Sequence, residues 1–268
     1  MLAIISLFLP LLIQVAVLYG LSRLLSQLVL RHVGRKFFLI LTWPGVVAHE
    51  LSHLTACLFT FTRVTRVSLF NPQGGTLGFV EHEQTHHPVK KILISIAPLF
   101  GVTALLWVVV RWIWPDVYQQ QLTSVQMALS DFSSFHNFFK LSVDYIGDYW
   151  KYAKDLVSNF QFNQWQTYVG IYLLIAFSTH TAPSKEDLKH TYIGLFGAGV
   201  IFALMYGLDQ WLQVPITWQA IKLLTYPVFV LANFLTYGII FALIGTIPWL
   251  FVGVVWWVMS RGKRVSIV

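Results

Sequence analysis

Long apolar runs make up most of the chain, and short polar stretches separate most of them. A helix that crosses a bilayer needs about 20 mostly apolar residues. The last run, 217–260, is long enough for two spans. It contains the possible helix breakers Pro227 and Pro248 but no polar loop, so the choice between one span and two stays open. The pattern predicts an all-α polytopic membrane protein with about six transmembrane helices, at residues 2–30, 37–61, 89–113, 165–182, 191–213 and 217–260.

Two segments depart from this pattern. In the segment 63–88, two runs of β-branched and aromatic residues, 64–70 and 76–80, flank a turn rich in Pro and Gly, which predicts a β-hairpin insertion. The segment 115–164 mixes charged and aromatic residues, which is typical of amphipathic helices at a membrane surface. We see no internal repeat. Because the chain is so hydrophobic, residues 1–268 are expected to form a single membrane-embedded domain.

The composition agrees with a membrane protein. Hydrophobic residues make up 56% of the chain and charged residues 11%, whereas soluble domains contain about 25% charged residues. The net charge of +7 comes from basic residues that flank apolar runs, so we expect the lipid bilayer, and no nucleic acid, as a partner. The single cysteine, Cys57, excludes an intrachain disulfide and a cysteine-based zinc cluster.

The second apolar run contains the motif His49-Glu50-Leu51-Ser52-His53. Residues four apart project from the same face of a helix, about 6 Å from each other, so His49 and His53 could bind one Zn²⁺. Glu50, one step round the helix, could activate a water molecule on the metal. Charged and imidazole groups are costly inside an apolar run and are usually functional there. The alternative is a set of polar residues that join helices.

A second match to the same pattern, His82-Glu83-Gln84-Thr85-His86, lies at the end of the predicted hairpin. Its neighbours are polar and Pro88 follows closely, so a helix is not expected there and the two imidazoles need not share a face. We therefore do not expect this second match to bind metal. His82 alone could still lie near the active site, at the end of a hairpin strand.

A catalytic zinc ion takes three protein ligands and a water molecule, so the histidine pair needs one more ligand. The best candidates follow the fourth apolar run: Asp187 is preferred, then Glu186 and His180, and Asp209 is weaker. An alternative is that Ser184 caps a helix whose first turn carries Glu186 and Asp187, because the N-terminal dipole favours acidic residues. Capping and metal binding can coexist.

Four stretches together resemble the site-2-protease class of intramembrane zinc metalloproteases. They are the motif at 49–53, Gly78-Phe79-Val80-Glu81-His82, Ile96-Ala97-Pro98-Leu99-Phe100-Gly101 and Pro183-Ser184-Lys185-Glu186-Asp187-Leu188-Lys189. The resemblance covers about residues 37–190. It implies His49 and His53 as zinc ligands, Glu50 as general base and an aspartate, here Asp187, as third ligand. Members often carry that aspartate in an Asn-Pro…Leu-Asp-Gly motif, which this chain lacks.

The resemblance also implies that the hairpin presents the substrate to the zinc ion as an added strand. The substrate-binding residues would then be Thr76, Leu77, Gly78, Phe79 and Val80. The expected function is an intramembrane zinc metalloprotease that cuts a transmembrane or membrane-proximal segment of a membrane-protein substrate. The alternatives are an inactive scaffold or chaperone homologue, and a membrane zinc protease of another layout that cuts soluble or lipidated peptides.

The distribution of basic residues predicts the orientation. Cytoplasmic loops carry an excess of Lys and Arg. With six spans and a cytoplasmic N-terminus, and with 115–164 uncounted, nine basic residues would face the cytoplasm and four the outside. We therefore expect a multi-pass protein of the plasma membrane with its N-terminus in the cytoplasm. The cytoplasmic set is Arg63, Arg66, Lys90, Lys91, Lys185, Lys189, Arg261, Lys263 and Arg264, and the outer set is Arg31, Arg35, Lys36 and Lys222.

Overall fold

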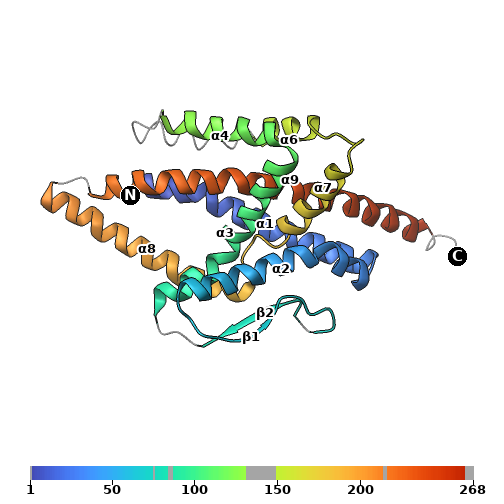
Figure 1. Cartoon of the computed structure of the whole chain (residues 1–268), viewed down its shortest axis with the longest axis horizontal. Coiled ribbons are helices and arrows are strands. Elements are labelled where there is room, and N and C mark those ends of the chain that lie inside the picture. The colour runs from blue at the N-terminus through green and yellow to red at the C-terminus, as the bar shows by residue number, and fades with distance from the viewer. Residues whose placement is uncertain (1, 75, 84–86, 131–148, 214–215, 263–268) are drawn as a thin grey trace.

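The computed structural model describes residues 2–74, 76–83, 87–130, 149–213 and 216–262. They are mostly helical, with one small antiparallel sheet (Figure 1), which confirms the predicted helical chain with a hairpin after the His49–His53 helix. The elements are α1 (Leu2–His32), α2 (Arg35–Phe59), β1 (Val64–Ser68), β2 (Phe79–His82), α3 (Pro88–Ile113), α4 (Pro115–Ser130), α6 (Tyr149–Ser158), α7 (Trp165–Ser178), α8 (Lys185–Leu212) and α9 (Ile216–Gly262).

Among the described residues, three helices are long and apolar enough to cross a membrane by length and composition. The apolar segments are Leu11–His32 of α1, Val89–Ile113 of α3 and Val230–Val255 of α9. The last apolar run of the sequence forms one continuous helix of 47 residues. Helix α7 has 14 residues, fewer than the roughly 20 that a straight span needs.

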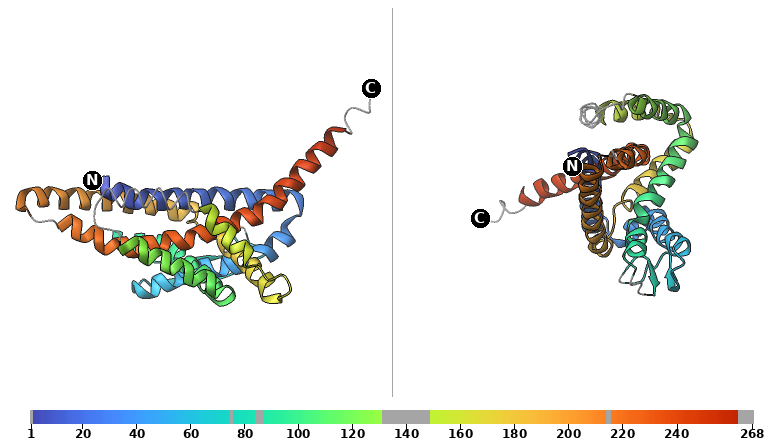
Figure 2. Two further views of the ribbon diagram at one scale, coloured as in Figure 1. Left: turned by 90° about the horizontal axis from the view of Figure 1, so that it is seen from above. Right: turned by 90° about the vertical axis from the view of Figure 1, so that its left-hand side faces the viewer.

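Helices α1 and α9 run side by side through the middle of the molecule (Figures 1 and 2). A buried polar contact joins them, because Gln14 donates a hydrogen bond from Nε2 to the carbonyl oxygen of Ala232 at 3.0 Å. The main apolar core lies where α3, α4, α7 and α9 meet, and it contains the rings of Trp114 and Phe241.

The predicted surface segment 115–164 forms α4 and α6 where it is described, and residues 131–148 lie outside the described residues. Tyr118 of α4 and Leu156 of α6 are buried against the main core. The two helices lie on the opposite side of the molecule from the hairpin, in Figure 1 and in the right-hand view of Figure 2. They therefore do not cover the hairpin.

Helix α2, which carries the histidine motif, packs closely between α3 and α7. A Cβ atom on Gly45 would overlap the carbonyl oxygen of Ala176 on α7, and one on Gly101 of α3 would overlap the Ser52 hydroxyl. Small residues at such crossings let helix backbones approach closely. These contacts hold α2 at a fixed depth and rotation between its neighbours.

A proline in α2 makes a further link to α7. Because Pro44 has no backbone N–H, the carbonyl of Ile40, four residues earlier, loses its usual helical donor. The Tyr172 hydroxyl of α7 donates a hydrogen bond to that carbonyl at 2.5 Å. A side chain of the neighbouring helix thus supplies the hydrogen-bond donor that the Ile40 carbonyl lacks within α2.

The hairpin differs in detail from the sequence-based prediction. The second strand was predicted at 76–80 and the first at 64–70, but the ladder pairs Ser68 with Phe79 and ends there. Beyond this pair the chain turns, and the Asn71 N–H donates to the Leu77 carbonyl at 2.5 Å. This turn takes Thr76 out of the strand. Arg35, at the start of α2, anchors the turn by donating to the Pro72 and Gly74 carbonyls.

The packing of α2 predicts that Gly45→Ala destabilises the protein. The added methyl group would meet backbone, which cannot rotate away, and overpacking typically costs about 1–3 kcal/mol. Gly207 of α8 is the matched control, because nothing lies within 4 Å of its would-be Cβ. Thermal unfolding in detergent should show a lower midpoint for Gly45→Ala, and an equal or higher one for Gly207→Ala. Equal midpoints for Gly45→Ala and the unchanged chain would contradict the close packing.

Candidate metal centre

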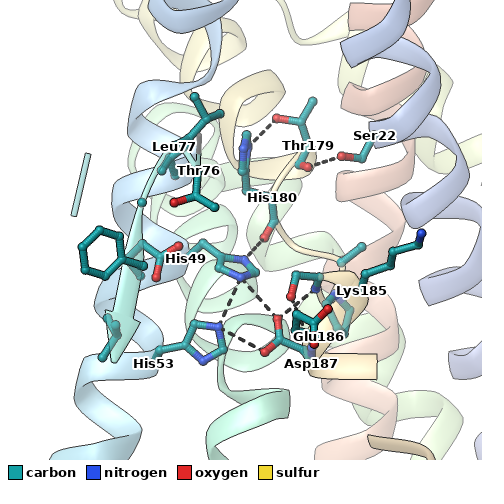
Figure 3. A pocket seen from close by; sticks show the side chains of 18 of the residues that line it. Ser22, His49, His53, Thr76, Leu77, Thr179, His180, Lys185, Glu186 and Asp187 are labelled. Carbon is teal, nitrogen blue, oxygen red and sulfur yellow. Dashed lines mark hydrogen bonds and ion pairs between the residues drawn. The ribbon is translucent and has the colours of Figure 1, made fainter. Parts of the chain in front are cut away.

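Three side chains from two helices converge on one point (Figure 3). His49 and His53 come from α2, and Asp187 from the first turn of α8. The two imidazole Nε2 atoms are 3.3 Å apart. The Asp187 carboxylate oxygens lie 3.6 Å from Nε2 of His49 and 3.5 Å from Nε2 of His53. The fold thus brings the preferred third-ligand candidate to the histidine pair.

Backbone carbonyls orient both imidazole rings. Nδ1 of His49 lies 2.8 Å from the carbonyl oxygen of His180, and Nδ1 of His53 lies 2.8 Å from that of Ile94. A carbonyl oxygen can only accept, so each Nδ1 carries the proton and donates it. In the neutral rings each Nε2 therefore has a lone pair directed at the shared point, which is the arrangement that metal-binding histidines require.

The acceptor for His53 is made available by a proline. Pro98 lies within α3 and lacks an N–H, so the carbonyl of Ile94, four residues earlier, has no helical donor. The Nδ1–H group of His53 donates to this carbonyl instead. Pro98, in the stretch at 96–101, therefore helps to orient His53 by leaving the Ile94 carbonyl free to accept its hydrogen bond.

Asp187 both caps α8 and faces the histidines. The Ser184 hydroxyl accepts a hydrogen bond from the Asp187 N–H at 3.2 Å, and Asp187 Oδ2 accepts from the Ser184 N–H at 2.9 Å. This reciprocal capping box fixes the carboxylate direction. Asp187 is 9% exposed, whereas Glu186 is exposed to solvent. Capping and convergence on the histidines therefore occur in the same residue.

Burial also affects the charge of this carboxyl group. Burial by itself raises the pKa of Asp187, but its interactions with His49, His53 and Ser184 outweigh burial and hold the pKa well below its usual range. The group is therefore an anionic carboxylate at neutral pH, which is the form that binds metal ions.

The donor atoms fit a tetrahedral zinc ion. Either a proton on one imidazole Nε2 or a metal cation between the three groups offsets the repulsion of their lone pairs at 3.3–3.6 Å. Zinc binds imidazole nitrogen at about 2.0–2.1 Å, which places tetrahedral ligand atoms about 3.3 Å from each other. Two neutral imidazoles and one carboxylate, with room for a fourth ligand, form a donor set of the catalytic type.

The other predicted ligands lie elsewhere. The His180 ring is held by Thr179 Oγ1 at 2.9 Å and by the Ala176 carbonyl at 3.2 Å, and this residue contributes its backbone carbonyl to the centre. Asp209 is 22 residues beyond Asp187 on the same helix (209 − 187), which at about 1.5 Å per residue is roughly 33 Å away.

The second histidine motif is split between the hairpin and a part of the chain outside the described residues, which includes His86. His82 ends β2 and lines the same cleft as His49, as expected for a residue at the end of a hairpin strand.

The metal centre opens into a cleft of about 760 Å³. Glu50 lines it, and so do all five predicted substrate-binding residues, Thr76, Leu77, Gly78, Phe79 and Val80. Gly78 passes directly over the general-base candidate, since a Cβ there would lie 2.6 Å from Glu50 Cγ. The hairpin thus forms one wall of the cleft, beside the motif helix.

The wall contributed by α1 was not predicted from the sequence. It consists of Tyr19, Ser22, Arg23 and Ser26, polar residues spaced i, i+3, i+4 and i+7 on one helix face. That spacing within an apolar run was the available signal. No sequence signal could have shown that the Ile94 and His180 carbonyls orient the histidines, because every residue carries the same backbone groups.

No protein-family model, curated protein or solved structure matches the chain. The resemblance to the site-2-protease class therefore rests on the sequence motifs alone.

The geometry of the centre predicts which acidic residue binds the metal. Asp187→Ala should lower bound zinc well below one ion per chain, because two imidazoles alone hold the ion poorly. Glu186→Ala removes a neighbouring, exposed carboxylate and serves as the control, with zinc content unchanged. Metal analysis of the purified proteins by mass spectrometry makes the comparison. Full zinc in Asp187→Ala would overturn the assignment.

The two histidine motifs should also differ in their effect on metal content. His49→Ala or His53→Ala should strip the zinc, since each removes one of three converging ligands. His86→Ala should leave the metal content unchanged. A zinc loss in the His86 variant that matches the loss in His53→Ala would show that the second motif holds the metal.

Proposed function

We propose that this chain is an intramembrane zinc metalloprotease of the site-2-protease class, which cuts a transmembrane or membrane-proximal segment of another membrane protein. The observation that carries the proposal is the convergence of His49, His53 and Asp187 beside Glu50, in a cleft with a β-hairpin as one wall. Zn²⁺ bound to this donor set would act as a Lewis acid that activates water and polarises the scissile carbonyl.

The proposed role of Glu50 follows from its place in the cleft. Its carboxylate accepts a proton from the attacking water as the water oxygen bonds to the scissile carbonyl carbon. Glu50 then gives this proton to the amide nitrogen as the C–N bond breaks and the amine leaves. The Nδ1 hydrogen bonds of His49 and His53 keep both rings in place throughout.

The hairpin supplies a way to hold an unwound substrate. A helical substrate must unwind locally before its carbonyls can be attacked, because helical carbonyls are already hydrogen-bonded. In the two-stranded sheet of the described residues, β1 covers one edge of β2, while Phe79, Val80 and His82 of β2 line the cleft. An extended substrate segment can pair with the other edge of β2 as an added strand.

The proposed setting is a membrane. The apolar parts of α1, α3 and α9 are compatible with spans, and we propose about six spans in total, in the plasma membrane, with the N-terminus in the cytoplasm. This orientation places the larger set of basic residues on the cytoplasmic side.

Two other functions account for fewer of these features. A membrane zinc protease with a glutamate ligand on a later helix would need such a residue, and the chain has no Glu after Glu186. An inactive scaffold or chaperone would have no need of a capped, buried carboxylate facing two oriented imidazoles. Zinc content and proteolysis distinguish the three functions.

The proposal predicts that Glu50→Gln abolishes cleavage and leaves zinc bound. The amide has the volume of the carboxylate but cannot accept the water proton, so the loss should be at least about 100-fold. Membrane fractions from cells with the unchanged or the Glu50→Gln chain can be compared by proteomics for fragments that need the active copy. Zinc analysis of the same preparations is the folding control. Equal fragment yields from the two proteins would refute the proposed mechanism.

A further inference from the structure

The cleft has a second wall whose chemistry differs from that of the hairpin. The polar face of α1, formed by Tyr19, Ser22, Arg23 and Ser26, lines the cleft together with the metal-centre residues. Ser22 donates from Oγ to the carbonyl oxygen of Thr179, the residue before His180, as Figure 3 shows. Since the His180 carbonyl orients His49, this face of α1 is attached to the metal centre through two short contacts.

Arg23 places a charged group on this face where membrane insertion is energetically unfavourable. It lies near the middle of Leu11–His32, one of the apolar segments that could cross a membrane. A charged residue at the centre of a spanning helix costs about 2.5–3.5 kcal/mol on insertion scales, and such residues usually face a cavity and mark substrate or ion paths. Arg23 lines the cleft, in agreement with that rule.

The guanidinium group is held in place at the cleft wall. Arg23 donates from an Nη atom to the Tyr19 hydroxyl at 3.1 Å, and its Cζ lies 5.4 Å from the centre of the Tyr19 ring. Neither contact neutralises its charge. Among the described residues, no carboxylate forms an ion pair with Arg23.

A second cation lines the same cleft at an unfavourable place. Lys185 is the first residue of α8, where the positive end of the helix dipole disfavours a cation. It is exposed, and no described carboxylate forms an ion pair with it. Figure 3 shows its side chain extending from α8 away from the histidine pair. The cleft therefore offers two cations, Arg23 and Lys185, beside the metal centre.

We propose that Arg23, assisted by Lys185, binds an acidic side chain of the substrate near the scissile bond. This inference rests on the proposed protease function and adds its substrate class: segments with Asp or Glu at a fixed position. The hairpin would bind the substrate backbone, which every sequence offers, while the α1 wall selects by charge. A guanidinium prefers carboxylate partners because its planar donors match their oxygens.

The test uses the purified protein in detergent and a chymotryptic digest of solubilised membrane proteins as the peptide library, because chymotrypsin leaves both acidic and basic residues inside the peptides. Mass spectrometry identifies new cleavage sites, and those absent with Glu50→Gln count as specific. Asp and Glu should be enriched at one position in the products of the unchanged chain. Arg23→Gln should remove most of the enrichment, Arg23→Glu should favour Lys and Arg there, and Arg23→Lys should retain more of the enrichment than Arg23→Gln does.

A double-mutant cycle makes the test quantitative. The best-cleaved peptide and its Asp→Asn or Glu→Gln counterpart should differ at least about tenfold in kcat/KM with the unchanged protein, as for a charge-assisted hydrogen bond. With Arg23→Gln most of this difference should disappear, and with Arg23→Gln and Lys185→Gln together the two peptides should be cut at equal rates. Arg111→Gln is the matched control, because Arg111 also packs over aromatic rings, those of Trp107 and Tyr118, but does not line the cleft.

The outcomes separate the two proposals. Specific cleavage with the same residue preference in the unchanged chain and Arg23→Gln overturns the role of Arg23 and leaves the protease function standing. Absence of any Glu50-dependent cleavage refutes the protease function, and this inference with it. If Arg23→Gln lowers cleavage only in vesicles with anionic lipids, with no change in preference, the guanidinium binds lipid phosphate and the inference is wrong. Zinc content of each variant shows that its metal centre is intact.

Discussion

The hydrogen bonds from two imidazole N–H groups to backbone carbonyls are the interactions on which the candidate site depends. They fix which nitrogen of His49 and of His53 is free, and they aim both lone pairs at one point. The acceptors belong to α3 and to the turn after α7, so the site exists only while α2 keeps its place between those elements. The glycine contacts at Gly45 and Gly101 bring α2 close enough for this. A small shift of α2 would misdirect both rings, because both histidines lie on this helix.

Local and tertiary requirements coincide at the start of α8. The exposed N–H groups of a helix N-terminus need acceptors, and Asp187 satisfies one of them through its capping box with Ser184. The same hydrogen bonds restrict the rotation of the carboxylate that faces the histidines. Two prolines act in a comparable way inside helices. Pro44 and Pro98 each leave one carbonyl without a donor, and a side chain from a neighbouring helix fills each place.

The two walls of the cleft present different chemistry to a bound segment. The hairpin wall offers a strand edge, whose hydrogen-bonding groups match any extended peptide. The α1 wall offers hydroxyl groups and the guanidinium of Arg23. In the proposed protease, the hairpin wall would hold the substrate and the α1 wall would select it. No described residue of the segment 115–164 lines the cleft, and the helices α4 and α6 lie on the opposite side of the molecule from the hairpin.

The sequence by itself determined the helical class, the hairpin after the motif helix and the pairing of His49 with His53, because each depends on short-range periodicity or on composition. It also ranked Asp187 above Glu186 and His180, but residue types alone could not decide among them. The tertiary structure shows that Asp187 faces the histidine pair, since the turn at Ser184 buries this carboxylate and exposes that of Glu186. It likewise revealed that the carbonyls of Ile94 and His180 accept hydrogen bonds from the two imidazoles, and that Arg23 lines the cleft. These features depend on contacts between segments that are far apart in the sequence, and local sequence patterns do not predict such contacts.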